Sequence, residues 1–212
     1  MDLRNVFIAL GVVVGIYLAT TLTKINPKGR RVAVIGDSHS AGKGWGWQDT
    51  LSSKYNFQLE NLAVTGKSTP WMVETLKKFY ADGKTADIVL IYGGANDAFG
   101  QTKEADTIKN IQTMVDMVRD KGGKAIVLAG FNYDKAVKPN VTDNYYGGIA
   151  KYMRIQDLIS KDIQNAVVVP RWEDVTAKSV GGDGFHLPKS SQTLFANYVA
   201  KKVFIWTLKI KR

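Results

Sequence analysis

The chain contains no cysteine, and it has only two histidines among its 212 residues. Without cysteine, a disulfide framework and a cysteine-ligated metal are both excluded, and the redox compartment is left open. The histidines, His39 and His186, form neither a His-x-x-His nor a His-Glu-x-x-His pattern, which argues against a zinc site. We therefore expect a protein that works without a metal and without another cofactor.

The charge of the chain is strongly one-sided, with a net value of +10 and an isoelectric point near 9.6. Such a balance suits an acidic partner, for example an anionic membrane surface, a cell-wall polymer or nucleic acid. It is equally compatible with an ordinary solvated surface. No nucleic-acid-binding motif accompanies the basic residues, so no specific nucleic-acid partner is expected.

Strand-like and helix-like segments alternate along the chain after residue 30. The expected strands are 31–36, 57–63, 87–92, 124–130 and 166–170, and the expected helices are 44–55, 70–81, 103–121, 146–161 and 189–207. This alternation predicts a three-layer α/β/α domain around a five-stranded, mostly parallel sheet. A single domain over residues 25–212 is long enough to bury one core.

A serine and a distant histidine carry the chemistry of the sequence. Ser38 lies in Gly36-Asp37-Ser38-His39-Ser40, directly after an apolar run, and Asp183-Gly-Phe-His186 follows about 150 residues later. A serine hydroxyl becomes a good nucleophile when a base takes its proton and a carboxylate orients that base. Ser38, His186 and Asp183 supply these three parts.

Two further segments turn the triad into a family resemblance. They are Asn61-Leu-Ala-Val-Thr-Gly66 after the second expected strand and Gly93-Gly-Ala-Asn96-Asp97 after the third. Together with the serine and histidine blocks, they resemble the SGNH, or GDSL-like, hydrolases. The resemblance implies a flavodoxin-like SGNH hydrolase fold, a nucleophilic Ser38 and a base His186 oriented by Asp183. It also implies an oxyanion hole formed by Ser38, Gly66 and Asn96.

The resemblance implies a serine esterase, and we expect removal of a small acyl group, most plausibly acetyl, from a carbohydrate or cell-wall polymer. Lipases, lysophospholipases and thioesterases of the same family are the nearest alternatives. From a different class, the fold could serve as a non-catalytic glycan-binding or structural module of an envelope or virion. A complete triad argues against that alternative, because a binding module does not need one.

Several of these residues also allow a purely structural interpretation. Asp37 and Ser38 are favoured at helix N-termini, and Asn96 with Asp97 is common in turns. His39 departs from the family pattern, in which many members carry leucine after the nucleophile. It is compatible with packing or with a substrate contact, but a residue adjacent to Ser38 cannot easily serve as its base.

Aromatic residues near the expected site are candidates for substrate contact. Trp45 and Trp47 follow the nucleophile block and could line an acyl or glycan pocket, although core packing explains them as well. Tyr133 and Tyr145 lie in a polar, aromatic stretch over residues 131–148. Such a stretch suits sugar rings through hydrogen bonds and stacking, and it also suits any surface loop.

The amino-terminal segment predicts a membrane anchor. Residues 5–23 contain no charge, and as a helix they would span close to the ~30 Å of a bilayer core. We therefore expect residues 1–24 to form a single-pass N-terminal anchor or an uncleaved signal. A cleaved signal peptide is the alternative, although Ala19-Thr-Thr21 is a poor cleavage site.

The side of the membrane is left open by the sequence. Four basic residues follow the segment, while only Arg4 precedes it, and the positive-inside tendency would place the domain in the cytoplasm. An esterase acting on wall polymers would instead face the periplasm or the exterior, and a viral membrane protein could satisfy both conditions. The oligomeric state is also left open.

Overall fold

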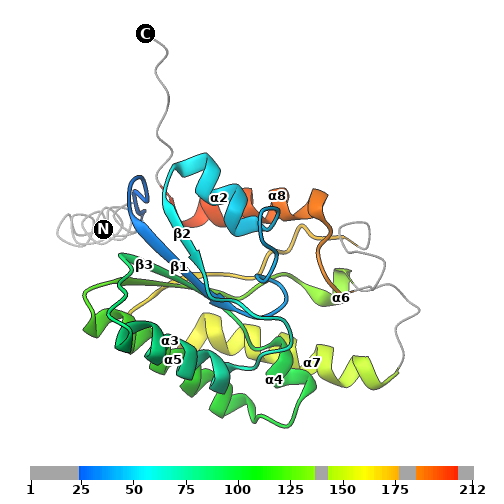
Figure 1. Cartoon of the computed structure of the whole chain (residues 1–212). Coiled ribbons are helices and arrows are strands. Elements are labelled where there is room, and N and C mark those ends of the chain that lie inside the picture. Colours follow the sequence, from blue (N-terminus) through cyan, green and yellow to red (C-terminus); the bar gives the residue numbers. More distant parts are fainter. Residues whose placement is uncertain (1–23, 137–142, 177–184, 205–212) are drawn as a thin grey trace, which may run out of the picture.

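The computed structural model describes residues 24–136, 143–176 and 185–204, and these form a three-layer α/β/α domain (Figure 1). The central sheet has five parallel strands in the order β2-β1-β3-β4-β5. The strands are β1 (Arg31–Gly36), β2 (Gln58–Asn61), β3 (Ile88–Tyr92), β4 (Lys124–Leu128) and β5 (Val167–Val169). The predicted α/β/α architecture and the five strands are therefore confirmed, with β2, β4 and β5 shorter than expected.

The central strands are continuous apolar runs because both faces of the sheet are covered by helices. All five residues of β3 are buried, and only the first residue of β1 is exposed. The chain crosses from β1 outward to β2 and then returns to pair β3 with β1. The order of the strands reverses at β1, and open α/β sheets bind ligands beside such a switch point, at the carboxyl ends of the strands.

Helices pack on both faces of this sheet (Figure 1). One face carries α2 (Trp47–Tyr55) and α8 (Lys189–Val203), which pack against each other. The other face carries α3 (Thr69–Ala81), α5 (Glu104–Asp120) and α7 (Asp143–Asp162), with α5 in contact with both neighbours. Two short helices, α4 (Ala95–Phe99) and α6 (Tyr133–Ala136), follow the carboxyl ends of β3 and β4.

The helix boundaries differ from the expected ones in ways that matter for the site. The first expected helix begins three residues later, at Trp47, because residues 42–46 form a turn-rich loop in which Gly44 has a φ of +77°. The residues Asn96 and Asp97 were expected to follow β3 without helical structure, and they lie instead inside α4. The last helix ends at Val203, and residues 205–212 lie outside the described part of the chain.

The expected membrane segment, residues 5–23, also lies outside the described residues. Within the ranges that the structure describes, no helix combines the length and the apolar character needed to cross a membrane.

Candidate active site

The candidate nucleophile Ser38 lies at the carboxyl end of β1, where the chain turns away from the sheet. The turn is tight because Gly36 sits against β3: a Cβ at this position would lie 2.6 Å from the Tyr92 carbonyl oxygen. Only glycine allows the two backbones to approach so closely. The turn leaves Ser38 half-buried at the edge of the sheet.

The structure brings Ser38 and His186 together although 148 residues separate them in the sequence. His186 Nε2 lies 2.8 Å from Ser38 Oγ, within hydrogen-bond distance, and His186 is half-buried. This is the spacing at which an imidazole can accept a proton from a serine hydroxyl. Asp183, the expected orienting carboxylate, falls in residues 177–184 and lies outside the described part of the chain.

The segment that carries His186 is tied to the start of α2 by one glutamine. Gln192 Nε2 donates to the Leu187 carbonyl oxygen at 2.9 Å, and the backbone N–H of Trp47 donates to Gln192 Oε1 at 3.1 Å. Gln192 is only 5% exposed, so water competes little for these bonds. The glutamine therefore fixes the histidine segment relative to the loop that follows the serine.

The loop after Ser38 is held by one half-buried and one buried side chain, Asn61 and Gln48, that reach its backbone. Asn61 Nδ2 and Gln48 Nε2 both donate to the Ser40 carbonyl oxygen, at 2.8 and 3.0 Å. Buried polar groups that are paired in this way resist displacement, because an unpaired carbonyl would cost free energy. A rigid loop of this kind keeps Ser38 in one orientation.

Two of the expected oxyanion donors lie on neighbouring segments. Gly66 has a φ of +76°, a conformation that glycine adopts readily, and a Cβ on it would meet no protein atom within 4 Å. The conformation of the backbone therefore explains this glycine. Asn96 is half-buried in α4, and its Nδ2 donates to the Lys67 carbonyl oxygen at 3.2 Å. The Asn96 amide also hydrogen-bonds to the Asp37 carboxyl, which lowers the Asp37 pKa. A substrate oxygen that binds the Asn96 amide would therefore share or replace one of these two bonds.

A buried carboxylate holds these two segments in register. Asp97 is fully buried, and its Oδ2 accepts the backbone N–H of Thr69 at 2.9 Å while its Oδ1 accepts the Thr69 hydroxyl. The clamp joins α4 to the start of α3. Sequence reasoning missed Thr69, which is one of many polar residues at a helix start and shows no pattern of its own.

A second buried carboxylate, Asp37, precedes the candidate nucleophile. Its side chain is 1% exposed, and this burial raises its pKa from 3.8 to about 7. The nearby Asp97 carboxylate raises the pKa further, while the backbone N–H of His39, which donates to Asp37 Oδ1 at 3.0 Å, lowers it. Burial disfavours the charged form and dominates the balance. Asp37 is therefore protonated for a large fraction of the time near neutral pH.

The residues expected to contact substrate differ in how exposed their side chains are. Trp45 is 45% exposed, whereas Trp47 is completely buried and its Nε1 donates to the His39 carbonyl oxygen at 3.1 Å. The expectation of a pocket-lining Trp47 is corrected by this burial, because the ring packs in the core. Tyr133 is also completely buried and bonds to His39. The side chain of Tyr145 lies outside the described part of the structure.

The histidine next to the nucleophile packs against the expected base. His39 is 5% exposed, its Nε2 lies 2.6 Å from the Tyr133 hydroxyl, and its ring centroid lies 4.9 Å from that of His186. His39 therefore joins the serine loop, α6 and the histidine segment. Of its two expected roles, packing agrees with this burial, and a substrate contact does not.

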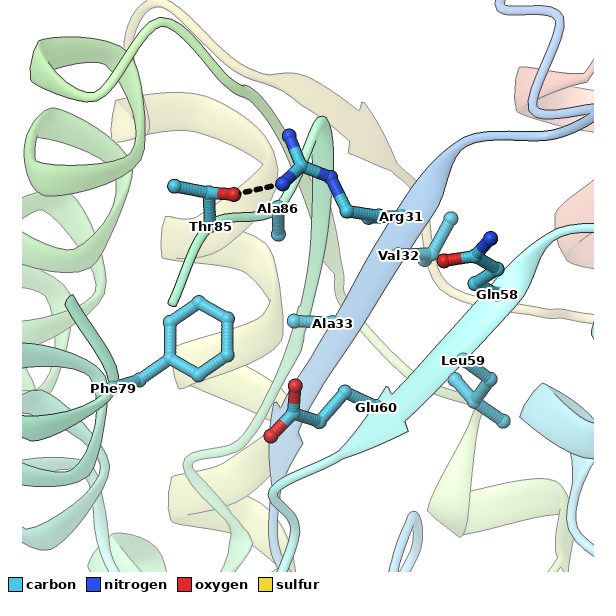
Figure 2. Close-up of a pocket in the computed structure, with 9 residues that line it drawn as sticks. All are labelled: Arg31, Val32, Ala33, Gln58, Leu59, Glu60, Phe79, Thr85 and Ala86. Atoms are coloured by element: carbon cyan, nitrogen blue, oxygen red, sulfur yellow. Dashed lines mark hydrogen bonds between the residues drawn. The ribbon is translucent and has the colours of Figure 1, made fainter. Parts of the chain in front are cut away.

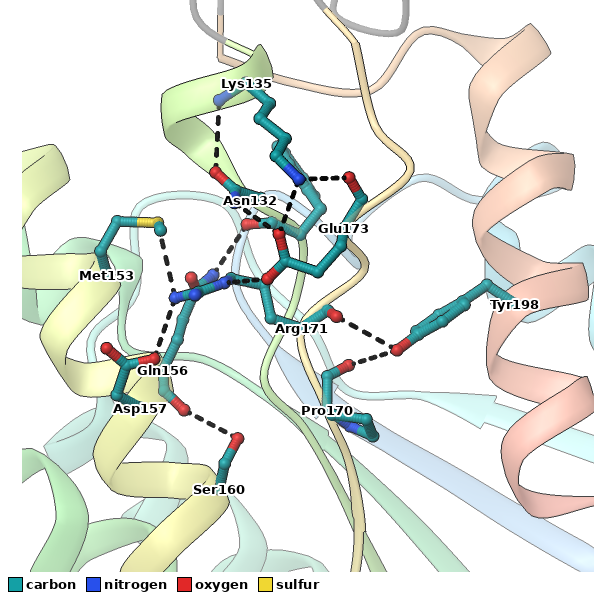
Figure 3. A network of polar contacts seen from close by, with 11 residues as sticks. Asn132, Lys135, Met153, Gln156, Asp157, Ser160, Pro170, Arg171, Glu173 and Tyr198 are labelled. Carbon is teal, nitrogen blue, oxygen red and sulfur yellow. Dashed lines mark hydrogen bonds and ion pairs between the residues drawn. The ribbon is translucent and has the colours of Figure 1, made fainter.

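A network of ion pairs holds the chain after β5 in place (Figure 3). Glu173 accepts from Asn132 Nδ2 at 2.6 Å, from Arg171 Nε at 2.8 Å and from Lys135 Nζ at 3.2 Å. The hydrogen bonds from Arg171 and Asn132 lower the Glu173 pKa to about 2. Exposed pairs of this kind stabilise a fold only modestly. Their effect here is to tie α6 to the segment that leads towards His186.

Two hollows of the described surface lie at opposite ends of the domain. A cavity of about 230 Å³ lies at the amino ends of β1 and β2, where Arg31, Glu60 and Phe79 surround it (Figure 2). It is at the opposite edge of the sheet from Ser38 and holds no serine or histidine. A larger groove of about 480 Å³ lies between α2 and α8, beside Trp45 and Lys189.

Comparison with known proteins identifies the family. Residues 34–189 match the model of the GDSL-like lipase/acylhydrolase family. The chain belongs to this family. The match covers most of the sequence and includes Ser38, Gly66, Asn96, Asp183 and His186. The resemblance inferred from four short blocks is thereby confirmed, and the chain is a hydrolase that acts on ester bonds.

Relatives of this hydrolase include esterases. It is 24% identical over 194 residues to an arylesterase of Vibrio mimicus, a match that covers 86% of this chain and 92% of the relative. The acetylxylan esterase Axe2 of Geobacillus stearothermophilus shares the fold with a TM-score of 0.64 at 12% identity, covering 88% of this chain and 100% of Axe2.

The psychrotrophic esterase EstA of Pseudoalteromonas has a TM-score of 0.58 at 19% identity, covering 81% of this hydrolase and 94% of EstA. At identities this low, the likeness to these two solved structures establishes the fold alone, and the substrate has to be argued from the site.

Proposed function

We propose that this hydrolase is a serine esterase that removes a small acyl group, most plausibly acetyl, from a carbohydrate or cell-wall polymer. The observation that carries the proposal is the 2.8 Å distance between His186 Nε2 and Ser38 Oγ at the carboxyl edge of the sheet. An esterase needs a nucleophile and a base at this distance, and it needs donors for the oxyanion nearby.

The proposed reaction has two steps. Ser38 Oγ attacks the ester carbonyl carbon while His186 Nε2 takes the hydroxyl proton, and the negative charge that forms on the carbonyl oxygen meets Ser38 N–H, Gly66 N–H and the Asn96 amide. The tetrahedral intermediate collapses, the alcohol leaves with the proton from His186, and an acyl-serine remains. Water then attacks the acyl-serine with help from His186, which releases the acid and restores Ser38.

Asp183 is assigned by family position to the carboxylate that orients the His186 ring. The two oxyanion donors outside the serine turn rest on different observations. The Asn96 amide is oriented by the Lys67 carbonyl oxygen, and Gly66 has the positive φ that exposes its backbone. Each well-placed oxyanion donor contributes ~3–4 kcal/mol to stabilisation of the transition state.

The groove beside Trp45 supports a sugar as the part of the substrate that lies outside the acyl group. An exposed indole face, hydroxyls and charged groups line it together: Trp45, Asp49, Thr50, Lys54, Lys189 and Thr193. Rings with polar edges bind well between an aromatic face and hydrogen-bonding groups. Lys189 follows His186 by three residues, so their Cα atoms are at most ~11 Å apart. The groove therefore begins close to the catalytic edge of the sheet.

Replacing Trp45 with alanine tests the role of the groove. The variant is expected to raise KM for an acetylated xylooligosaccharide ~5-fold or more, which is the effect of losing about 1 kcal/mol of aromatic contact. The rate with p-nitrophenyl acetate is expected to stay at the parent value, because its small acyl ester does not reach the groove. Initial rates over a range of substrate concentrations measure both values.

Leu194→Ala is a matched control. Leu194 lies on α8 and, like Trp45, is a large exposed apolar side chain, but it does not line the groove. If Trp45→Ala leaves KM for the oligosaccharide unchanged, the groove is not a sugar site.

A panel of esters tests the substrate class as a whole. The parent is expected to release acetate from acetylated xylan and to hydrolyse p-nitrophenyl acetate faster than the esters of long fatty acids. Higher kcat/KM for long acyl chains, for lysophospholipids or for acyl thioesters would replace the carbohydrate assignment with the corresponding alternative. Ser38→Ala is the control for non-enzymatic hydrolysis. No release of acyl groups from any ester or thioester would favour the non-catalytic alternative.

We also propose that residues 1–24 anchor the enzyme in a membrane, on the basis of the uncharged run at residues 5–23. Fractionation tests this: the full chain should sediment with membranes and resist extraction by high salt, whereas the chain from residue 25 onward should not. A full chain that appears in the supernatant at low salt would exclude a retained anchor.

A further inference from the structure

His39 lies directly behind the nucleophile, and its backbone is fixed on both sides. Its N–H donates to Asp37 Oδ1 at 3.0 Å, and its carbonyl oxygen accepts the indole N–H of Trp47 at 3.1 Å. Both partners are buried, and the His39 side chain is itself only 5% exposed. The turn that presents Ser38 therefore also determines the direction of the His39 ring.

The hydroxyl of Tyr133 meets the outer nitrogen of this ring. His39 Nε2 and Tyr133 Oη are 2.6 Å apart. Tyr133 is fully buried, stacks on Phe131 with ring centroids 4.4 Å apart, and meets Tyr152 edge-on at 5.2 Å. A tyrosine that is packed on both sides cannot swing its hydroxyl away. His39 is therefore anchored to α6 as well as to the serine turn.

The ring of His39 supports the ring of the proposed base. The centroids of His39 and His186 are 4.9 Å apart with an angle of 38° between the planes. The ring centroid of Phe185 lies 5.4 Å from that of His39 and 5.0 Å from that of Tyr133. The rings of Tyr133, Phe185 and His186 thus form an aromatic enclosure around His39. On its other side, His186 reaches Ser38 Oγ. The position of the His186 ring over the serine is thus fixed from behind by His39.

We propose that the His39–Tyr133 pair positions the His186 ring for proton transfer from Ser38, with the Tyr133 hydroxyl donating to Nε2 of an uncharged His39. The proposal rests on the esterase mechanism given above. In that mechanism His186 becomes positively charged when Ser38 attacks, and a charged His39 in the same enclosure would repel it. A hydrogen bond to the Nε2 lone pair opposes this second charge, because a proton could bind there only after the bond breaks.

The other titratable groups near His39, among the described residues, are compatible with an uncharged ring. Tyr92 stacks on it at 5.6 Å, and burial raises the Tyr92 pKa well above its usual value, so this tyrosine carries no charge. Asp37 accepts the backbone N–H of His39, and burial raises its pKa to about 7. At slightly acidic pH neither group supplies the negative charge that would favour a protonated His39.

Three substitutions separate positioning from simple packing. His39→Leu fills the space without a bond to Tyr133, His39→Gln keeps a group that can bond to the hydroxyl but cannot become charged, and Tyr133→Phe removes the hydroxyl alone. We expect His39→Leu to lower kcat for p-nitrophenyl acetate ~10–100-fold with little change in KM, because the base is no longer held over Ser38. His39→Gln is expected to restore most of kcat.

Tyr133→Phe is expected to lose activity mainly on the acid side of the rate profile, measured from about pH 5 to about pH 9, because the free Nε2 lone pair can then take a proton. Tyr152→Phe is the matched control: it removes another buried hydroxyl beside Tyr133 that is not bonded to His39, and its kcat and pH profile should equal those of the parent. Thermal unfolding of each variant verifies that it is folded.

A folded His39→Leu variant with the parent kcat and pH profile would overturn the proposal, and so would a folded His39→Gln variant as slow as His39→Leu. A Tyr133→Phe profile that matches the parent would refute the role of the hydroxyl. A parent enzyme that hydrolyses no ester would instead count against the proposed function, so the two failures are distinguishable.

Discussion

Ser38→Ala is expected to lower kcat for ester hydrolysis by at least ~10³-fold, and His186→Ala by a similar factor. The reason is the 2.8 Å contact between the two side chains: without Oγ there is no nucleophile, and without Nε2 there is no base to activate it. Because the two residues act as a unit, the double variant should be little worse than either single variant. Initial rates with p-nitrophenyl acetate measure all three.

Covalent labelling with a fluorophosphonate gives a second readout that does not depend on the unknown substrate. The chain from residue 25 onward should carry the adduct on Ser38, identified by mass spectrometry, and labelling should collapse in Ser38→Ala and His186→Ala. Ser40→Ala is a suitable control, because Ser40 is a fully buried serine in the same loop and should leave labelling in place. An adduct on another residue, or a folded parent that stays unlabelled, would contradict the assignment of the nucleophile.

Much of the fold could be predicted from the sequence because parallel strands buried on both faces leave a clear pattern. The residues of β3 form an uninterrupted apolar run, and the helix α5 places Ile111, Met114, Val115 and Val118 in the core at helical spacing. Short elements were missed for the opposite reason. The helix α4 has five residues, which is too few for a hydrophobic period to appear.

The site was predictable where family blocks name its residues, and it was not where packing decides. The pairing of Ser38 with His186 was expected from two blocks in the sequence. For Trp47 the sequence left pocket lining and core packing both open, because its partner, the His39 carbonyl oxygen, is part of a turn whose path the sequence does not reveal. The bond between Tyr133 and His39 joins residues 94 positions apart on different elements.

Gly66 has a conformational role in the structure that its place in the sequence does not reveal. A glycine at an oxyanion position is commonly explained by the missing Cβ, which lets the backbone approach a ligand. The structure shows in addition a positive φ at Gly66, with no protein atom within 4 Å of where a Cβ would lie. The cause that the structure supplies is conformational.

Replacing Asp37 with asparagine changes the free energy of unfolding, and we expect this change to be more favourable at alkaline pH than at acidic pH. Burial raises the pKa of the Asp37 carboxyl from 3.8 to about 7, so between these values the folded state holds a proton that the unfolded state has lost. This stabilising contribution is complete below pH 3.8 and disappears as the pH rises through 7. A shift of this size corresponds to ~4 kcal/mol of unfolding free energy.

The quantity to measure is the effect of Asp37→Asn on the unfolding free energy at one pH minus its effect at the other. This difference is needed because asparagine has a destabilising effect of its own. The Asp37 carboxyl is buried beside the Asn96 amide, and an amide group at position 37 would bury a second donor there at a cost of ~1–3 kcal/mol. That cost is the same at both pH values and cancels. Urea unfolding of parent and variant near pH 4 and near pH 8.5 should show asparagine gaining ~3–4 kcal/mol relative to aspartate.

Asp37→Asn also bears on the chemistry, because the Asp37 carboxyl lies near the Asn96 amide. An ionised carboxylate there would oppose the negative charge that develops on the ester oxygen during attack, and a protonated one would not. An equal change in unfolding free energy at both pH values would show that Asp37 ionises in the folded protein as it does in the unfolded chain. The carboxylate would then be charged during catalysis, and Asn96 would have to stabilise the oxyanion beside it.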